Sequence, residues 1–212
     1  MAWQTAPLIY GMDLFGCAAA AVAASTLAKR VGLDFIGAVM IASIGAIGGG
    51  TLRDLLINRH PLFWLHDLNY LYVIVSTAIL VQIFYHHIES IFERPLRFFD
   101  AIGLGAFAVI GFQVAMSKNL AYPFVILMGV LTAVAGGIMR DIICNKLPLV
   151  LCREIYISCV IIGGLVYLGL TEWHFSPWLR DILTMLCVII LRLFAIRGDW
   201  QLPSLSITPK RK

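Results

Sequence analysis

The segment Gly48-Gly49-Gly50-Thr51-Leu52-Arg53-Asp54 lies within an apolar run, and Gly136-Gly137-Ile138-Met139-Arg140-Asp141 repeats it 87 residues later. The same offset pairs residues of different types far outside these segments: Asp13 with Asp100, Gly16 with Gly103, Asn58 with Asn145 and Pro61 with Pro148. A constant, gap-free offset indicates an internal duplication. Each copy carries a glycine-rich apolar segment followed by an Arg-Asp pair.

The composition is that of a membrane protein. Of the 212 residues, 60% are hydrophobic and 13% are charged, with a mean hydropathy of +0.90. A soluble domain carries about 25% charged residues. The five cysteines form no Cys-x-x-Cys pair and predict neither a disulfide framework nor a zinc site. No nucleophile–base arrangement or phosphate-binding loop occurs, so we expect no enzyme, metal, cofactor or nucleic-acid partner.

Membrane-spanning helices need about 20 mostly apolar residues. Seven segments qualify: 6–28, 35–57, 68–86, 98–116, 121–144, 154–171 and 178–196. Three spans per copy is an odd number, so the second copy enters the bilayer from the opposite side. We therefore predict an all-α integral membrane domain over residues 1–212. It would contain inverted three-helix repeats at about 6–86 and 98–171, a seventh helix at about 178–197 and a flexible tail at 198–212.

The distribution of Lys and Arg gives an orientation. With the N-terminus outside, the outer side receives Arg53, Arg59, Lys118 and Arg180, and the inner side receives the other 12 basic residues. The positive-inside rule then places the C-terminus in the cytoplasm. The first and fourth spans are rich in Gly and Ala, and we expect them to be central, with their small faces buried.

Consecutive glycines in a span predict a break, since each costs a helix about 1 kcal/mol relative to alanine. We predict that the second and fifth helices break and expose carbonyls and amides to a permeating solute. Their positions along the spans predict one constriction toward each side of the membrane. The candidate residues of this pore or binding site are Gly48, Gly49, Gly50, Thr51, Arg53, Asp54, Gly136, Gly137, Arg140 and Asp141.

The Arg-Asp pairs allow three roles: buried struts, residues that line the path, or arginines that snorkel to an interface. Adjacent helical positions point about 100° apart, so each arginine is expected to pair with a carboxylate on another helix. Asn58 and Asn145 follow the aspartates by four residues, which predicts a shared helix face. For Asp13 and Asp100 we favour an N-cap, or a partner for an arginine, over a cation ligand.

Several spaced motifs carry a family resemblance: GGGTLRD at 48–54, PLFW at 61–64, GGIMRD at 136–141, LPLVL at 147–151, REIY at 153–156 and RLFAIR at 192–197. Together they resemble the trimeric intracellular cation channels, and most closely the prokaryotic arm, whose domain is called a bacterial glycine transporter domain. The resemblance implies a homotrimer with a pore in each protomer, lined by the second and fifth helices and permeable to K+. Animal members carry a Lys-Glu-Val motif where this chain has 51–54, so their lipid and calcium control is not implied.

Two functions remain open. In a K+ channel, carbonyls of the glycine segments, helped by Thr51, would replace part of the ion's hydration shell. That requires Arg53 and Arg140 to be neutralised by carboxylates. In a carrier of glycine or another small zwitterion, the arginines and amides would bind the carboxylate, and the aspartates would bind the ammonium. The resemblance favours the channel, in a bacterial inner membrane and in contact with its lipids.

Overall fold

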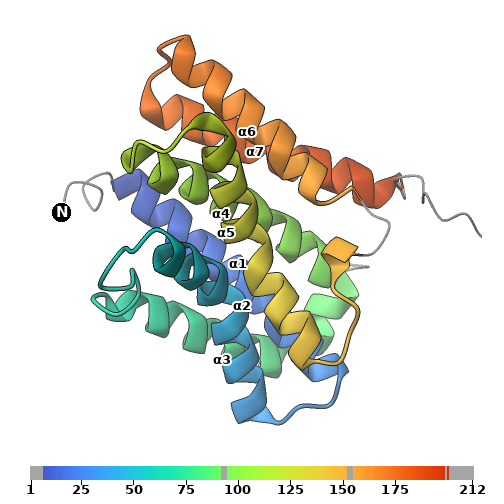
Figure 1. Ribbon diagram of the computed structural model, residues 1–212. Helices are drawn as coiled ribbons and strands as arrows, with labels where there is room; N and C mark the ends of the chain where they lie inside the picture. Colours follow the sequence, from blue (N-terminus) through green and yellow to red (C-terminus); the bar gives the residue numbers. More distant parts are fainter. Residues whose placement is uncertain (1–6, 92–94, 152–154, 199, 201–212) are drawn as a thin grey trace, which may run out of the picture.

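The computed structural model describes residues 7–91, 95–151, 155–198 and 200 (Figure 1). Within these residues the chain is all-helical, which confirms the predicted fold class. The helices are α1 (Pro7–Arg30), α2 (Phe35–Leu56), α3 (Leu68–Ile91), α4 (Pro95–Ser117), α5 (Tyr122–Ile143), α6 (Ile157–Glu172) and α7 (Pro177–Arg197), with a 3₁₀ turn at Leu149–Leu151. Most of the predicted tail, residues 201–212, lies outside the described part.

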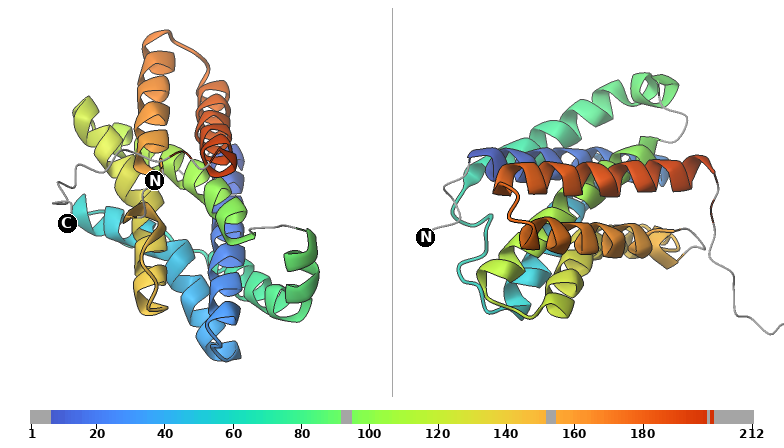
Figure 2. Two further views of the ribbon diagram at one scale, coloured as in Figure 1. Left: turned by 90° about the vertical axis from the view of Figure 1, so that its right-hand side faces the viewer. Right: turned by 90° about the horizontal axis from the view of Figure 1, so that it is seen from above.

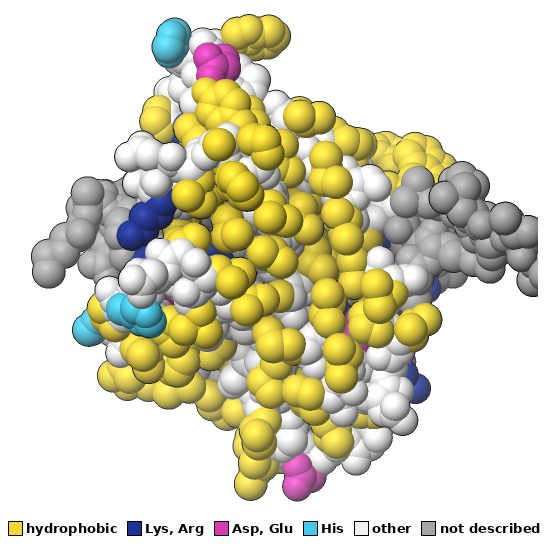
Figure 3. All heavy atoms as spheres, viewed as in Figure 1, with side chains coloured by type: hydrophobic (Ala, Val, Ile, Leu, Met, Phe, Trp, Pro, Cys, Tyr) yellow, Lys and Arg dark blue, Asp and Glu magenta, His cyan; other side chains and the backbone are white. Residues whose placement is uncertain are grey.

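Successive helices run in opposite directions, so that their ends gather on two sides of the bundle (Figure 1). Five helices, α1 to α5, are long and apolar enough to cross a membrane, while α6 is apolar but has only 16 residues. Apolar side chains cover the face seen in Figure 3, and the basic side chains visible there lie toward its edges. The chain is an integral membrane protein.

The small-residue helices α1 and α4 form the centre of the bundle, as predicted. They are the most buried of the five long spans. A Cβ atom on Gly16 of α1 would lie 2.8 Å from the Cβ of Ala106 on α4. Close approach of this kind takes the place of hydrophobic association, which lipid does not provide. Around this centre, α3 lies on one flank and the α6–α7 pair on the opposite flank (Figures 1 and 2).

The predicted breaks at the glycine segments are wrong: α2 and α5 are continuous through all residues of both segments. A break would free several backbone groups on each side, and each unsatisfied group costs several kcal/mol in hydrocarbon. Three glycines cost a helix only about 3 kcal/mol. Keeping the helix intact therefore has the lower free energy.

The glycines instead allow α2 and α5 to touch through their backbones. A Cβ on Gly49 would lie 2.1 Å from the carbonyl oxygen of Thr132, and one on Gly136 would lie 2.4 Å from that of Gly45. Only a hydrogen can occupy the side-chain position at these two points. The glycine segments thus fix the crossing of the two helices.

These contacts are reciprocal under the 87-residue offset. Thr132 corresponds to Gly45 and Gly136 corresponds to Gly49, so the two contacts exchange when the repeats are exchanged. A Cβ on Gly49 would lie 3.4 Å from the backbone nitrogen of Gly136, and a Cβ on Gly136 would lie 3.4 Å from the backbone nitrogen of Gly49. Exchange of this kind is expected of inverted repeats related by a pseudo-two-fold axis that passes between Gly49 and Gly136.

Candidate functional site

The Arg-Asp pairs lie in the last turns of α2 and α5, just before each helix ends in the same way. Asn58 and Asn145 have φ values of 50° and 53°, in the left-handed region that asparagine tolerates. The amide after each one bonds back to the aspartate's carbonyl, at 2.7 Å for Arg59 and 2.8 Å for Lys146. Both asparagines are exposed and lie beyond the helix ends, so the predicted face shared with the aspartates does not arise.

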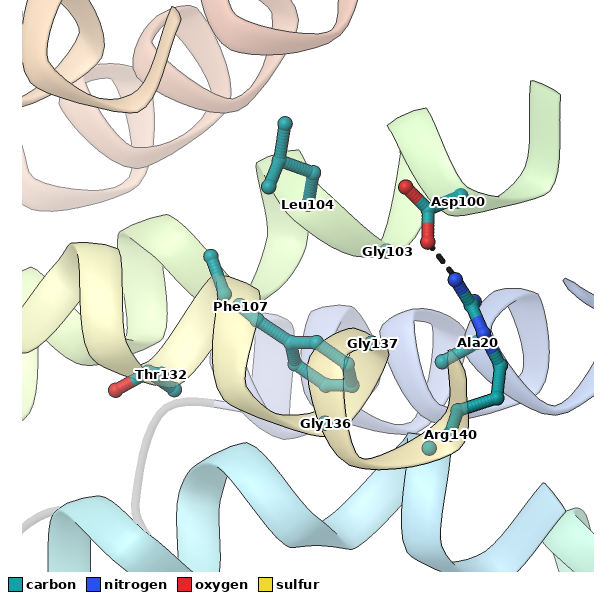
Figure 4. Close-up of a pocket in the computed structure, with 11 residues that line it drawn as sticks. Ala20, Asp100, Gly103, Leu104, Phe107, Thr132, Gly136, Gly137 and Arg140 are labelled. Atoms are coloured by element: carbon teal, nitrogen blue, oxygen red, sulfur yellow. Dashed lines mark hydrogen bonds and ion pairs between the residues drawn. The ribbon is translucent and has the colours of Figure 1, made fainter. Parts of the chain in front are cut away.

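Arg140 is held by two carboxylates. Its Nε donates to Asp141 Oδ1 at 2.8 Å, and its Nη1 donates to Asp100 Oδ1 on α4 at 2.9 Å (Figure 4). The hydroxyl of Tyr156 donates to the other Asp100 oxygen at 2.6 Å. Because Arg140 is only 2% exposed, it does not snorkel to the surface. The predicted pairing of an arginine with a carboxylate on another helix is confirmed here.

The equivalent residues of the first repeat are arranged differently. Arg53, also 2% exposed, pairs with Asp54 at 2.8 Å, and Arg59 joins the same carboxylate oxygen at 3.2 Å. Asp13 accepts a hydrogen bond from Tyr70 at 2.7 Å. Among the described residues, Arg53 forms no ion pair with Asp13, although the corresponding Arg140–Asp100 pair is closed.

Both arginines pair with the adjacent aspartate, which the 100° argument did not predict. A guanidinium lies at the end of a long side chain and can bend back along the helix to reach a neighbouring carboxylate. The aspartates also cap loop amides: Asp54 Oδ2 accepts from Phe63 N at 3.2 Å, and Asp141 Oδ2 accepts from Leu149 N at 3.0 Å. Each pair thus braces the connection that follows its helix.

A small cavity lies beside the crossing of α2 and α5, among residues of α1, α2, α4 and α5 (Figure 4). Its volume is about 10 Å³, enough for one water molecule at most. Asp100 and Arg140 contribute its charged groups. The remaining lining residues are Ala20, Gly45, Gly103, Leu104, Phe107, Thr132, Ala133, Gly136 and Gly137.

Seven of the ten predicted pore residues do not line this cavity: Gly48, Gly49, Gly50, Thr51, Arg53, Asp54 and Asp141. Gly48 faces Met139, since a Cβ there would lie within contact of its methyl carbon. Gly50 faces the ring of Phe63. The Thr51 hydroxyl donates to the carbonyl of Ile47 at 2.8 Å and accepts from the indole of Trp64 at 3.0 Å.

Sequence reasoning missed the two tyrosines that bind Asp13 and Asp100. Tyr70 and Tyr156 are 86 residues apart, one fewer than the offset of the duplication. A search for near-matches to the offset, and not only for exact ones, would have found them. Phe63 and Arg59 were missed as well, and neither has an identical residue at the corresponding position of the second repeat.

Comparison with known proteins agrees with this architecture. The sequence model of the family described as "Glycine transporter" matches the chain twice, over residues 10–86 and 97–172, which are the two repeats. A UPF0126 membrane protein of Vibrio cholerae is 36% identical over 201 residues, covering 95% of this chain and 84% of that protein. The UPF0126 inner membrane protein YadS of Escherichia coli is 32% identical, covering 94% of this chain and 97% of its own length.

The fold is similar to that of a cation channel of known structure. The chain superposes with a TM-score of 0.86 and 30% identity on the crystal structure of a TRIC trimeric intracellular cation channel orthologue from Rhodobacter sphaeroides. The match covers 92% of this chain and all of the other. The resemblance deduced from the motifs is thereby confirmed, and these relatives are membrane proteins and channels, not enzymes. The chain belongs to the glycine transporter family, within the superfamily of the TRIC channels.

Proposed function

We propose that this protein is a membrane channel for monovalent cations, chiefly K+, in which each protomer of a homotrimer conducts along the crossing of α2 and α5. The solved relative is described as a trimeric cation channel. The E. coli relative is named an inner membrane protein, which supports the same location here. The basic residues favour an outer N-terminus and a cytoplasmic C-terminus.

The observation that carries the proposal is that both arginines are paired with carboxylates. Arg140 contacts two carboxylates, and Arg53 contacts one that it shares with Arg59, with arginine-to-carboxylate distances of 2.8 to 2.9 Å for Arg140 and Arg53. A free guanidinium beside the path would repel a cation, and this arrangement avoids that. It also leaves neither guanidinium free for the carboxylate of an amino acid, which a glycine carrier would need.

Because α2 and α5 are continuous, their backbone carbonyls are not released to bind an ion. We therefore propose side-chain oxygens as the ion ligands. Thr132 and Asp100, which both carry side-chain oxygens, line the cavity. The Thr132 hydroxyl donates to the carbonyl of Met128 at 2.6 Å, so both of its lone pairs remain available to an ion once the helices separate. A cavity of about 10 Å³ has no room for glycine, or for K+ together with a water molecule of its hydration shell. The conformation described is therefore a closed one, and conduction requires α2 and α5 to separate locally.

Reconstitution of the purified protein in liposomes tests the proposal. We expect stepwise K+ currents at rates far above the turnover of a carrier. The Thr132→Val variant should reduce the current, while Thr184→Val, at a buried threonine on α7, should leave it unchanged. Saturable uptake of labelled glycine without a resolved current would overturn the channel and establish the alternative that the family's description suggests.

The trimer is tested separately. The mass of the protein–detergent complex, with bound detergent subtracted, should correspond to three chains. A monomer that still conducts would remove the trimer from the proposal and leave the pore in place.

A further inference from the structure

The two repeats differ at one pair of equivalent glycines. Gly50 and Gly137 are related by the 87-residue offset. A Cβ on Gly50 would lie 2.6 Å from Cε1 of Phe63, whereas the nearest atom to a Cβ on Gly137 is Nη2 of Arg140 at 3.7 Å. The aromatic ring therefore fills a position in the first repeat whose counterpart in the second repeat borders the cavity.

The ring of Phe63 lies among the charged residues of the first repeat. Its centroid is 5.6 Å from Cζ of Arg53, and it packs edge-to-face on Tyr70 with the centroids 5.0 Å apart. Tyr70 in turn binds Asp13. In the second repeat, the corresponding arginine and aspartate are in direct contact. The ring is 8% exposed, so it is inserted into the bundle and does not lie on its surface.

The loop that carries Phe63 is fastened to α2 at two points. The backbone amide of Phe63 donates to Asp54 at 3.2 Å, and the indole of its neighbour Trp64 donates to Thr51 at 3.0 Å. This loop, residues 57–67, joins α2 to α3 on the side of the bundle where α1 begins (Figure 1). The motifs at 48–54 and 61–64 thus form one structural unit. The first contributes Gly50, against which the ring packs, and the hydrogen-bond acceptors Thr51 and Asp54; the second contributes the Phe63 ring.

We infer that Phe63 is a plug that closes the first-repeat half of the conduction path, seated on Gly50 and held by Asp54 and Thr51. Departure of the ring would open beside Gly50 a space equivalent to the cavity beside Gly137. The gating role of Phe63 rests on the proposed function, because it presupposes a conduction path. The seating of the ring is independent of which solute passes.

Two pairs of variants test the plug by K+ flux into liposomes. Phe63→Ala removes the ring, and its control is Val150→Ala at the corresponding position of the second repeat. Gly50→Ala forces the ring from its seat, and its control is Gly169→Ala on α6, where the added methyl meets nothing within 4 Å. We expect about a tenfold rise in flux for Phe63→Ala and Gly50→Ala, equivalent to about 1.4 kcal/mol in the closing equilibrium. Both controls should conduct like the parent protein.

A second measurement does not depend on conduction. Cys17 on α1 is fully buried and corresponds by the offset to Leu104, which lines the cavity of the second repeat. With the other four cysteines replaced, Cys17 should react about tenfold faster with a small hydrophilic thiol reagent in Phe63→Ala than in the parent. Size-exclusion profiles and melting temperatures identify variants that are folded.

The outcomes separate the two proposals. Unchanged labelling of Cys17 in a folded Phe63→Ala protein overturns the plug, whatever the flux. Faster labelling without K+ flux in any variant supports the plug and overturns the K+ channel. A rise in flux for Val150→Ala equal to that for Phe63→Ala also overturns the plug, because any shortened side chain would then suffice.

Discussion

Alanine at Gly49 tests whether the glycine segments serve the crossing of α2 and α5. The new Cβ would lie 2.1 Å from the carbonyl oxygen of Thr132, about 1.3 Å short of an ordinary contact of 3.4 Å. A backbone atom cannot move aside as a flexible side chain does, so the helices must separate. Overpacking costs about 1–3 kcal/mol, and a gap of 0.5–1 Å forfeits about a quarter to a half of the dispersion attraction between facing atoms.

The opposing term is the helix propensity of alanine, which favours the variant by about 1 kcal/mol. With the overpacking cost at its upper end, Gly49→Ala should lower the free energy of unfolding by about 2 kcal/mol. For a chain of this size that corresponds to a fall in Tm of about 4–8 °C. Gly136→Ala should behave alike, because its Cβ would lie 2.4 Å from the carbonyl oxygen of Gly45.

Gly137→Ala is the matched control, one residue along the same helix. Its nearest neighbour would be 3.7 Å away, so only the propensity gain applies and Tm should rise by about 2–4 °C. Thermal unfolding in detergent, followed by the loss of the folded peak in size-exclusion chromatography, measures all three variants. If Gly49→Ala is as stable as Gly137→Ala, the helices do not meet through these glycines and the packing argument fails.

Three further comparisons use the differences between the repeats. Asp100→Asn breaks a buried ion pair and should cost about 3–5 kcal/mol of stability, while Asp13→Asn weakens one hydrogen bond and should cost about 1.5–3 kcal/mol; equal melting temperatures would contradict this. Arg140→Ala should destabilise more than Arg53→Ala, because it strips two carboxylates of their partner whereas Asp54 keeps Arg59; the reverse order would refute the asymmetry. Asn145→Ala should cost about 1–2 kcal/mol and Asn145→Gly almost nothing, with K+ flux unchanged in both; a loss of flux in folded Asn145→Gly would place this residue in the path.

The positions of the helices could be predicted from the sequence because hydropathy and charge determine where a chain crosses a membrane. The spans expected at 35–57 and 121–144 agree with α2 and α5 to within one residue at each end. The third span was predicted to end at residue 86; α3 instead kinks at Phe84, where φ is −97° and ψ is 17°, and continues to Ile91. Polar residues such as His87 and Glu89 extend a helix outside the apolar region as readily as they end it.

The continuity of α2 and α5 could not be predicted, because consecutive glycines have two opposite effects. They weaken a helix, and they also let another backbone approach it. The choice at Gly49 depends on the carbonyl of Thr132, a residue 83 positions away. The repeat offset contained this information in part, since it places Gly136 opposite Gly49 if the copies face one another across a two-fold axis. Adding that facing arrangement to the offset would have favoured the intact, closely packed helices.

The internal duplication predicts the surroundings of the two arginines only in part. The duplication predicts equal surroundings for Arg53 and Arg140, and both do pair with the following aspartate. The surroundings diverge because the loops after α2 and α5 differ: Phe63 stands where the second repeat has Val150. The Phe63 ring contacts both Arg53 and Tyr70 in the first repeat, whereas Arg140 forms an ion pair with Asp100 in the second. The helices therefore follow the duplicated sequence, and the asymmetry that closes one side of the bundle comes from the connections, where the copies have diverged.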